Sequence, residues 1–424
     1  MKLTQKYFLF CSIISLLMGC AHASDSAPKE YLCWLDNLKE EMISKGISED
    51  TINNIYGNNN FYKPNHEVVK IDRKQTEFVL TSTQYLNRIV NLKRVAQARE
   101  KYKQNYELLK PISDKYGVPV HYLVSFWGVE TNFGASFGGY STIEVLTTLS
   151  YDKRRSNFFK NELYNALKII DNNHIDYKKM QGSWAGAMGH FQFMPSTFNA
   201  YAVDYNKDGM IDIWNTFPDA AASAANYLSS IGWKKDEPWG VEVTLPWNFN
   251  YANSGRNNLK TVKEWKKLGV KAKQGNKIAV KDDVKAAVLL PDGRMGRAYL
   301  VFSNFNKIMQ WNRSENYALA VGILADYIKG KHNWQALKNH SSQRLKTDDI
   351  ITIQSFINRI GEFKLEEDGQ LGRKTKEAVR AVQKQAHLPQ DGYPDTKLLN
   401  KIKNYNPEIG FAIPVPDRKL HKVN

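Results

Sequence analysis

The chain has 424 residues, of which 42% are hydrophobic and 24% charged; this composition excludes a disordered protein and allows two or three folded domains. The formal net charge of +16 favours an anionic partner, such as an acidic polymer or a membrane surface, although charge spread over a solvated surface also accounts for it. Dense Lys/Arg blocks do not stand out, so we expect no nucleic acid partner.

The N-terminus, MKLTQKYFLFCSIISLLMGCAHAS, has the pattern of an export signal. Two lysines precede an apolar run from Tyr7 to Met18, which is too short and wrongly flanked for a membrane span. Two processing sites compete. The sequence LMGC resembles a bacterial lipobox, which gives a signal peptide of residues 1–19 and a lipidated Cys20, whereas AHA fits cleavage after residue 23. We expect an exported, periplasmic protein, with Cys20 as a lipid anchor to the outer membrane under the first alternative.

Helical patterns dominate the rest of the chain. Apolar residues spaced among charges predict one long amphipathic helix over roughly 76–110, interrupted by Pro111. Further helices are expected at 119–130, 158–171, 217–231 and 316–329. Between 240 and 305 the helical pattern weakens, and VEVTLPW, KIAV and AAVLLPDG favour short strands or extended segments. We therefore expect a mainly α protein with a small β insertion.

The same patterns divide the chain. Residues 28–332 form the expected main domain. The polar stretch near 338–348 (KNHSSQRLKTD) indicates a linker, which we assign to residues 333–347. Residues 348–404 form a compact helical segment after the linker.

Glu130 lies in the stretch WGVETNFG, residues 127–134. If 119–130 is a helix, Glu130 shares an apolar face with Trp127, Phe126 and Leu123. Poor hydration on such a face raises the pKa of a carboxyl, as a general acid at neutral pH requires. A glutamate at a helix end that is turned to solvent is the simpler interpretation of the spacing alone.

The sequence DYNKDGMID, residues 204–212, has the spacing of an EF-hand calcium loop. Oxygen donors fall at loop positions 1, 3, 5, 7 (a backbone carbonyl) and 9, with glycine at position 6: Asp204, Asn206, Asp208, Met210, Asp212 and Gly209. Position 12 is Asn215 rather than glutamate, and Asp219 is the candidate for that carboxylate. We expect one structural Ca²⁺ and no organic cofactor. A turn-rich loop without metal is the alternative.

A long segment, residues 180–198 (MQGSWAGAMGHFQFMPSTF), contains no Asp, Glu, Lys or Arg. Its glycines allow close approach of the backbone to a ligand, and neutral hydrogen-bonding groups beside aromatic rings suit a sugar. A tightly packed core turn explains the composition equally well. We expect His190 to be a structural polar residue rather than a ligand or base.

These motifs, in this order, resemble the membrane-bound lytic murein transglycosylase B family, glycoside hydrolase family 103. The matching stretches are WGVETNFG, LTTLSYDKRRSNFF, QGSWAGAMGHFQFMPSTF and AVDYNKDGMIDIW, which runs into FPDAAASAANYLSSIGW. The resemblance implies a lysozyme-like α fold. It also implies cleavage of the β-1,4 bond between N-acetylmuramic acid and N-acetylglucosamine in peptidoglycan, with formation of a 1,6-anhydro end. Glu130 would then act first as acid and afterwards as base.

The resemblance also assigns substrate contacts. It implies that Ser183, Gln192 and Tyr227 line the glycan groove and that Tyr317 lies near Glu130. Arg154 and Arg155 match an arginine pair that would contact stem-peptide carboxylates or anchor the fold. Trp311 stands where an aromatic residue is expected. The calcium loop matches as well, including Asp219.

The C-terminal segment resembles a small three-helix peptidoglycan-binding domain. The stretches that carry this likeness are ITIQSFINRIG and EEDGQLGRKTKEAVRAVQKQAHLPQDGYPDTKLL. Val382-Gln383 replaces the more common aromatic-Gln pair. Peptidoglycan glycan strands are therefore the expected partner, and the sequence does not identify protein partners.

Two other functions stay open. A hydrolytic muramidase would use water and a second carboxylate, for which Asp152, Glu162 and Asp171 are nearby in sequence. A non-catalytic wall-binding protein would need only the C-terminal domain and a stable scaffold.

Overall fold

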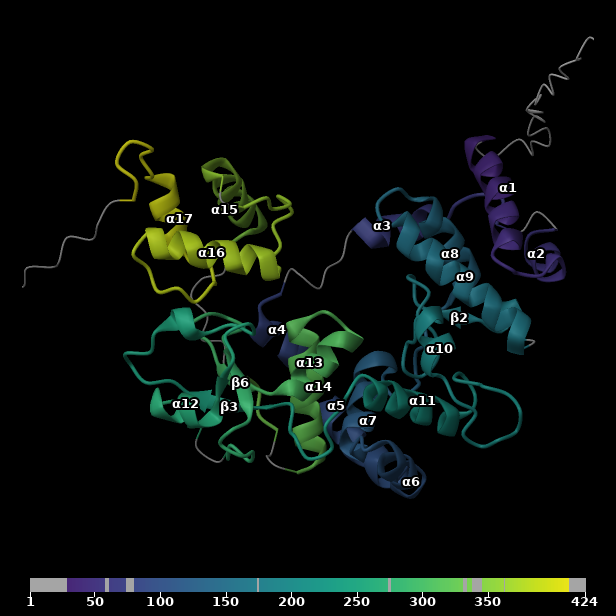
Figure 1. Ribbon diagram of the computed structural model, residues 1–424, viewed down its shortest axis with the longest axis horizontal. Helices are drawn as coiled ribbons and strands as arrows, with labels where there is room; N and C mark the ends of the chain where they lie inside the picture. Colours follow the sequence, from purple (N-terminus) through teal and green to yellow (C-terminus); the bar gives the residue numbers. More distant parts are fainter. Residues whose placement is uncertain are drawn as a thin grey trace, which may run out of the picture.

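The computed structural model describes residues 29–57, 61–73, 80–173, 175–273, 276–330, 334–337, 345–361 and 363–411. Within these ranges the chain is mainly helical, with a small antiparallel sheet (Figure 1). In the same ranges, no helix is both long and apolar enough to span a membrane. The export signal, both processing sites and Cys20 lie outside the described residues, as does most of the expected linker.

The first helices differ from the single long helix that the sequence predicted. The prediction over 76–110 was wrong, because Asn91 caps a new helix with its side chain and Asn105 separates the next one. Pro111 lies inside the helix Tyr106–Tyr116 and does not end it. The N-terminal helices are α1 (Lys29–Ser44), α2 (Glu49–Tyr56), α3 (His66–Arg73), α4 (Ser82–Ile89), α5 (Leu92–Gln104) and α6 (Tyr106–Tyr116).

The central helices build the largest hydrophobic core. Helix α7 (Val120–Thr131) is buried on nearly all sides and packs against α5 and α14 (Glu315–Ile328). A helix enclosed in this way needs an apolar sequence all round, as VHYLVSFWGV provides. The remaining elements of this part are β1 (Tyr140–Ser141), α8 (Thr142–Tyr151), α9 (Ser156–Asn173), η2 (Tyr177–Lys179), β2 (Gln181–Gly182), α10 (Pro195–Tyr201), α11 (Phe217–Ser230) and α13 (Ser303–Trp311).

The β insertion is a five-stranded antiparallel sheet in the order β4-β6-β7-β3-β5. Side chains of β6 and β7 alternate between two cores: Leu289 and Tyr299 join the helical core, whereas Val288 and Leu300 join a separate core under the sheet. The sheet therefore attaches the insertion to the helices. Its elements are β3 (Gly240–Thr244), η3 (Tyr251–Asn253), β4 (Lys260–Thr261), α12 (Val262–Lys267), β5 (Lys271–Ala272), β6 (Lys285–Leu289) and β7 (Ala298–Val301). Residues 277–280, one of the predicted strand segments, form no strand.

The C-terminal domain has its own core, formed by α15 (Thr347–Ile360), α16 (Arg373–Gln385) and α17 (Thr396–Lys403). Two buried glutamines, Gln354 and Gln383, organise its turns. Gln383 accepts from Gly392 N and donates to Asp391 and to the Tyr393 carbonyl, and Gln354 holds Asp368 and Gly369 in the same manner. Glutamine side chains therefore hold two Asp-Gly turns of this domain, at 368–369 and 391–392.

Candidate active site

The last turn of α7 carries Glu130. Its side chain is half-buried, and the hydroxyl of Tyr317, from the first turn of α14, donates a hydrogen bond to Glu130 Oε1. On the same helix Trp127 is 6% exposed and Phe126 is fully buried. Glu130 is therefore held at the edge of the helical core by a neutral donor from a distant part of the chain.

The chain turns sharply after Glu130, and this turn accounts for the two glycines in WGVETNFG. Asn132, Phe133 and Gly134 all have positive φ, at 50°, 62° and 79°. This turn folds the Phe133 ring back under the helix, where a Cβ on Gly128 would lie 2.6 Å from it. Gly134 is restricted in the same way by the ring of His190. The two glycines and the turn thus fix the end of α7 tightly beside the acid.

His190 joins this turn to the uncharged loop. The Trp127 indole donates to His190 Nδ1 at 3.0 Å, and Thr131 Oγ1 donates to the His190 carbonyl at 2.8 Å. Burial lowers the pKa of His190 to about 4, although the charge of Asp212 acts in the opposite sense. A neutral imidazole that accepts a hydrogen bond from Trp127 has a structural task, in line with the expectation from sequence.

Aromatic rings connect α7, the helix that carries Glu130, to α13 and α11. Trp311, at the end of α13, packs against Phe126 at 4.7 Å between ring centroids and against Tyr227 of α11 at 5.1 Å. Its ring also lies 5.4 Å from Phe193 of the uncharged loop. Tyr227 continues into an open hollow of about 390 Å³ with Tyr201 and Gln310. The rings therefore form a continuous path from α7 to a hollow that suits sugar units.

The residues predicted to line the groove make hydrogen bonds within the protein. Gln192 has a φ of 51°, and its amide nitrogen donates to the carbonyls of Phe137 and Gly189, both at 3.1 Å. The hydroxyl of Ser183 accepts from the backbone of its own turn at Ala187, 3.1 Å away. Tyr227 donates to the Gln310 carbonyl at 3.3 Å. Ser183 and Gln192 shape the loop itself, and Tyr227 lies on the path of aromatic rings.

Arg154 and Arg155 lie at the turn between α8 and α9. Both guanidinium groups pair with Asp72 of α3, which is only 3% exposed, and Arg154 Nε approaches Asp72 Oδ2 at 2.9 Å. Arg155 also stacks over the Phe159 ring. These contacts anchor α3 to α8 and α9. The two side chains remain 47% and 38% exposed, so they are also accessible to a ligand.

The loop between α10 and α11 has the form of a helix-loop-helix turn. Asp204 accepts from Gly209 N at 2.9 Å, and Gly209 adopts the positive φ that position 6 requires. Asp219 accepts from the backbone of Tyr205 and Asp212, and burial raises its pKa. Within the described ranges, His, Cys, Asp and Glu side chains do not gather in threes as a metal cluster would need. The donor set consists of hard oxygens, which fits Ca²⁺ by chemistry.

The other acids considered from sequence each hold a structural contact. Glu162 accepts from the backbone and hydroxyl of Ser196 at 2.9 and 2.8 Å. Asp171 accepts from Ser48 N at 3.0 Å, and Asp152 pairs with Arg73 at 2.8 Å. These carboxylates therefore join helices of the scaffold, whereas Glu130 is paired with Tyr317.

Comparison with known families gives a direct result. The transglycosylase SLT domain model matches residues 31–326, and a peptidoglycan binding domain model matches residues 346–402. This chain belongs to the SLT transglycosylase family. The mainly α, lysozyme-like fold with a C-terminal peptidoglycan-binding domain is thereby confirmed.

The chain is also similar to individual transglycosylases. Membrane-bound lytic murein transglycosylase B of Escherichia coli (strain K12) is 34% identical over 218 residues, which are 50% of this chain and 58% of that protein. The structure of SltB3 from Pseudomonas aeruginosa in complex with NAG-anhNAM-pentapeptide is 36% identical, with a TM-score of 0.81, and covers 88% of this chain and 99% of that one. The structure of E. coli Slt35 in complex with calcium is 27% identical, with a TM-score of 0.58, over 69% of this chain and 92% of that one.

Two features of the site were not assigned from sequence. Trp311 connects α7 to Tyr227, and the only sequence signal was that an aromatic residue stands at that position. The Trp127–His190 hydrogen bond was missed because 63 residues separate the partners. A tryptophan near a helix end and a histidine in a neutral loop give no sign that they meet.

Proposed function

We propose that this chain is a lytic murein transglycosylase. It would cleave the β-1,4 bond between N-acetylmuramic acid and N-acetylglucosamine and leave a 1,6-anhydromuramic acid end. The observation that carries the proposal is the Glu130–Tyr317 hydrogen bond at the end of a buried helix, in a chain of the SLT transglycosylase family. The relative SltB3 was crystallised with an anhydro-sugar peptide, which supports the same product class.

The proposed chemistry needs one carboxyl group, which acts twice. Protonated Glu130 gives its proton to the glycosidic oxygen as the bond to the muramic acid anomeric carbon breaks. The muramic acid 6-hydroxyl attacks that carbon, and the Glu130 carboxylate takes the hydroxyl proton. Glu130 ends in its starting form and no water is consumed. Ordinary glycosidases place a second carboxyl group at the bond to activate water or form a covalent intermediate.

Neighbouring side chains would assist Glu130 without exchanging protons. The Tyr317 hydroxyl donates to Oε1 and would hold the Glu130 carboxyl group in place. Ser183, Gln192 and Tyr227, with Trp311, would line the glycan groove. Arg154 and Arg155 would offer their exposed guanidinium edges to stem-peptide carboxylates while they hold Asp72.

Product analysis tests this function directly. Purified peptidoglycan is digested with the full chain, and the released fragments are weighed by mass spectrometry. Transglycosylase action gives anhydro ends, which are lighter by one water than the hydrolytic product. Reducing ends would mean a hydrolytic muramidase, and intact sacculi would mean a wall-binding protein; either result overturns the proposal.

We also propose that the loop at 204–212 binds one structural Ca²⁺, with Asp204, Asn206, Asp208, the Met210 carbonyl and Asp219 as ligands. The ion would offset the charge of carboxylates that include buried Asp219. Support comes from the hard-oxygen donors, from the turn at Gly209 and from a calcium complex of a relative. Here the residues would hold the ion and link α10 to α11.

Chelation tests the calcium proposal by stability. Binding at a hundred times Kd stabilises a protein by about 2.7 kcal/mol, so chelator should lower the melting temperature by roughly 5–10 °C. Added Ca²⁺ should restore it. Asp208→Ala, at an exposed position, should melt at the chelated temperature with or without Ca²⁺. Equal melting of the wild-type chain in chelator and in Ca²⁺ would show that the loop binds no ion.

Finally, we propose export to the periplasm, with lipid attachment at Cys20. The relative in E. coli is named membrane-bound, which supports the same location. Mass measurement of the mature N-terminus distinguishes the two processing sites. A lipid-modified Cys20 supports the anchor, whereas a chain that begins at Ser24 rejects it.

A further inference from the structure

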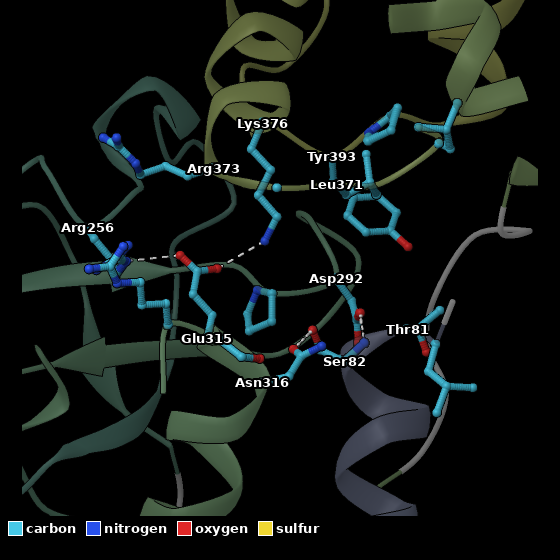
Figure 2. Close-up of a pocket in the computed structure, with 18 of the residues that line it drawn as sticks. Thr81, Ser82, Arg256, Asp292, Glu315, Asn316, Leu371, Arg373, Lys376 and Tyr393 are labelled. Atoms are coloured by element: carbon cyan, nitrogen blue, oxygen red, sulfur yellow. Dashed lines mark hydrogen bonds and ion pairs between the residues drawn. The ribbon is translucent and has the colours of Figure 1, made fainter. Parts of the chain in front are cut away.

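The C-terminal domain contacts the helix that carries Tyr317. Lys376 of α16 pairs with Glu315 Oε2 at 3.0 Å, and Arg256, from the loop before β4, pairs with Glu315 Oε1 at 3.1 Å. Figure 2 shows this group in the hollow of about 150 Å³ between the domains. The three side chains are only 21–24% exposed, so solvent screens their attraction less than it would a surface pair.

Glu315 is the first residue of α14, two positions before Tyr317. The cap residue Ser314 accepts from Tyr317 N at 3.2 Å, so Glu315, Asn316 and Tyr317 form one rigid helical turn. Tyr317 directs its hydroxyl to Glu130 from this turn. Any contact that moves the turn therefore moves the donor that holds the acid.

The same turn is held from a third side. Asn316 bonds to the hydroxyl of Ser82 at the start of α4. Asp292, 5% exposed and located after β6, accepts from the backbone of Ser82 and Thr83 at 2.7 and 2.9 Å. Figure 2 shows Ser82 between Asn316 and Asp292. With α4 fixed in this way, Lys376 connects this turn to the C-terminal domain.

The charges agree with a stable contact. Burial raises the pKa of Glu315, but the charges of Lys376 and Arg256 and their hydrogen bonds outweigh burial and lower it overall. Glu315 is therefore ionised at neutral pH. Its loss would leave two cations without their shared anion, and loss of Lys376 would leave the turn held by Arg256 alone on this side.

We propose that Lys376 and Glu315 are positioning residues for catalysis. Lys376 of the C-terminal domain holds, through Glu315, the helical turn that directs the Tyr317 hydroxyl to Glu130. This inference rests on the proposed transglycosylase function. It gives the C-terminal domain a part in completing the active site, in addition to wall binding.

The neighbouring residue Glu377 provides a matched control. It also lies on α16, where it accepts from Asn257 across the domain interface at 3.2 Å and pairs with Arg373 of its own helix at 3.5 Å. Glu377→Gln keeps the side-chain shape. Lys376→Met removes the charge at similar length, and Lys376→Arg keeps a cation that can reach Glu315.

The experiment is a double-mutant cycle on the full-length chain, measured with soluble glycan strands. Lys376→Met should lower kcat about tenfold with KM changed less than about twofold, the size of coupling usual within one hydrogen-bonded network. Lys376→Arg and Glu377→Gln should stay within about twofold of wild type. In a Tyr317→Phe background, Lys376→Met should cost less than about twofold, because the hydroxyl that it positions is already absent.

Several outcomes would overturn the inference. These are an unchanged kcat in Lys376→Met, the same loss in both backgrounds, or a loss carried by KM alone, which would indicate wall binding. Circular dichroism and melting curves check that each variant is folded. Should Lys376→Met fail to fold, Glu315→Gln replaces it in the same cycle. An inactive wild-type chain would reject the proposed function itself, so the two failures are distinguishable.

Discussion

Two glutamates at the ends of neighbouring helices have opposite surroundings. Glu130 lies in the last turn of α7, where the helix dipole is negative, and receives a hydrogen bond from the neutral phenol of Tyr317. Glu315 begins α14, at the positive end of its dipole, and is paired with two cations. The two helices pack against each other. The same residue type thus has a neutral hydrogen-bond donor at one helix end and two cationic partners at the other.

The largest expected effect is on kcat, and it distinguishes Glu130 from Glu315. Glu130→Gln keeps the shape but cannot exchange a proton, so we expect kcat to fall by about 10³-fold or more. Glu315→Gln should lower kcat only about tenfold, because it loosens the turn without removing the proton donor. Initial rates on glycan strands measure both. Comparable losses in the two variants would contradict the division of tasks.

The next effect tests the link between the two acids. Tyr317→Phe removes the hydrogen bond to Glu130 and leaves the ring packed, so we expect kcat to fall by roughly 10- to 100-fold, as for the loss of one charge-assisted hydrogen bond. KM should change little. Full activity in this variant would mean that the phenol only fills space.

A smaller effect concerns stability in acid. The pKa of Glu315 is lowered in the folded protein from an ordinary 4.5, so its contribution is present above about pH 4.5 and is lost as pH falls through the folded pKa. Glu315→Gln should therefore cost more stability at pH 7 than at pH 3.5, because the wild-type chain begins to lose this contribution below about pH 4.5. Urea unfolding at both values measures this difference. A cost independent of pH would show that charge is not the source.

The smallest effect belongs to His190, which also loses stability in acid, but because a neutral imidazole is buried rather than because a charge is paired. Its pKa is about 4 in the folded protein and 6.5 otherwise, so the unfolded chain takes up the proton first. Stability should fall between about pH 6.5 and 4 and then level off, by roughly 2 kcal/mol once partial exposure is allowed for. His190→Asn should lose this slope in urea unfolding. A slope that persists in the variant would assign it to other groups.

Sequence reasoning reached the elements that have local signals. The buried helix at 119–130, the helix-loop-helix at 204–212 and the C-terminal domain follow from periodicity and turn residues. The prediction of one long helix over 76–110 failed because Asn91 begins α5 with a side-chain cap and Asn105 ends it, and periodicity does not record such contacts. The stretch WGVETNFG could be singled out, but its glycines acquire a reason only once the Phe133 and His190 rings are seen against them.

Contacts between distant segments could not be predicted from the residues alone. Tyr317 near Glu130 came from family resemblance, since 187 residues separate them. Glu315 and Lys376 gave no signal, because a glutamate at a helix start and a lysine on a charged helix are ordinary surface residues. Their importance arises only when the C-terminal domain is placed against α14.

The separation between Glu130 and Tyr317 has a consequence for folding order. The turn that supports the acid is made within residues 127–134 and can form early, because local contacts close at little entropic cost. The hydrogen bond from Tyr317 forms only after the segments between them have assembled. A chain that is exported before it folds would therefore carry an incomplete catalytic pair until its tertiary structure is finished. Such a delay would keep a wall-cutting protein inactive during its own synthesis and transport.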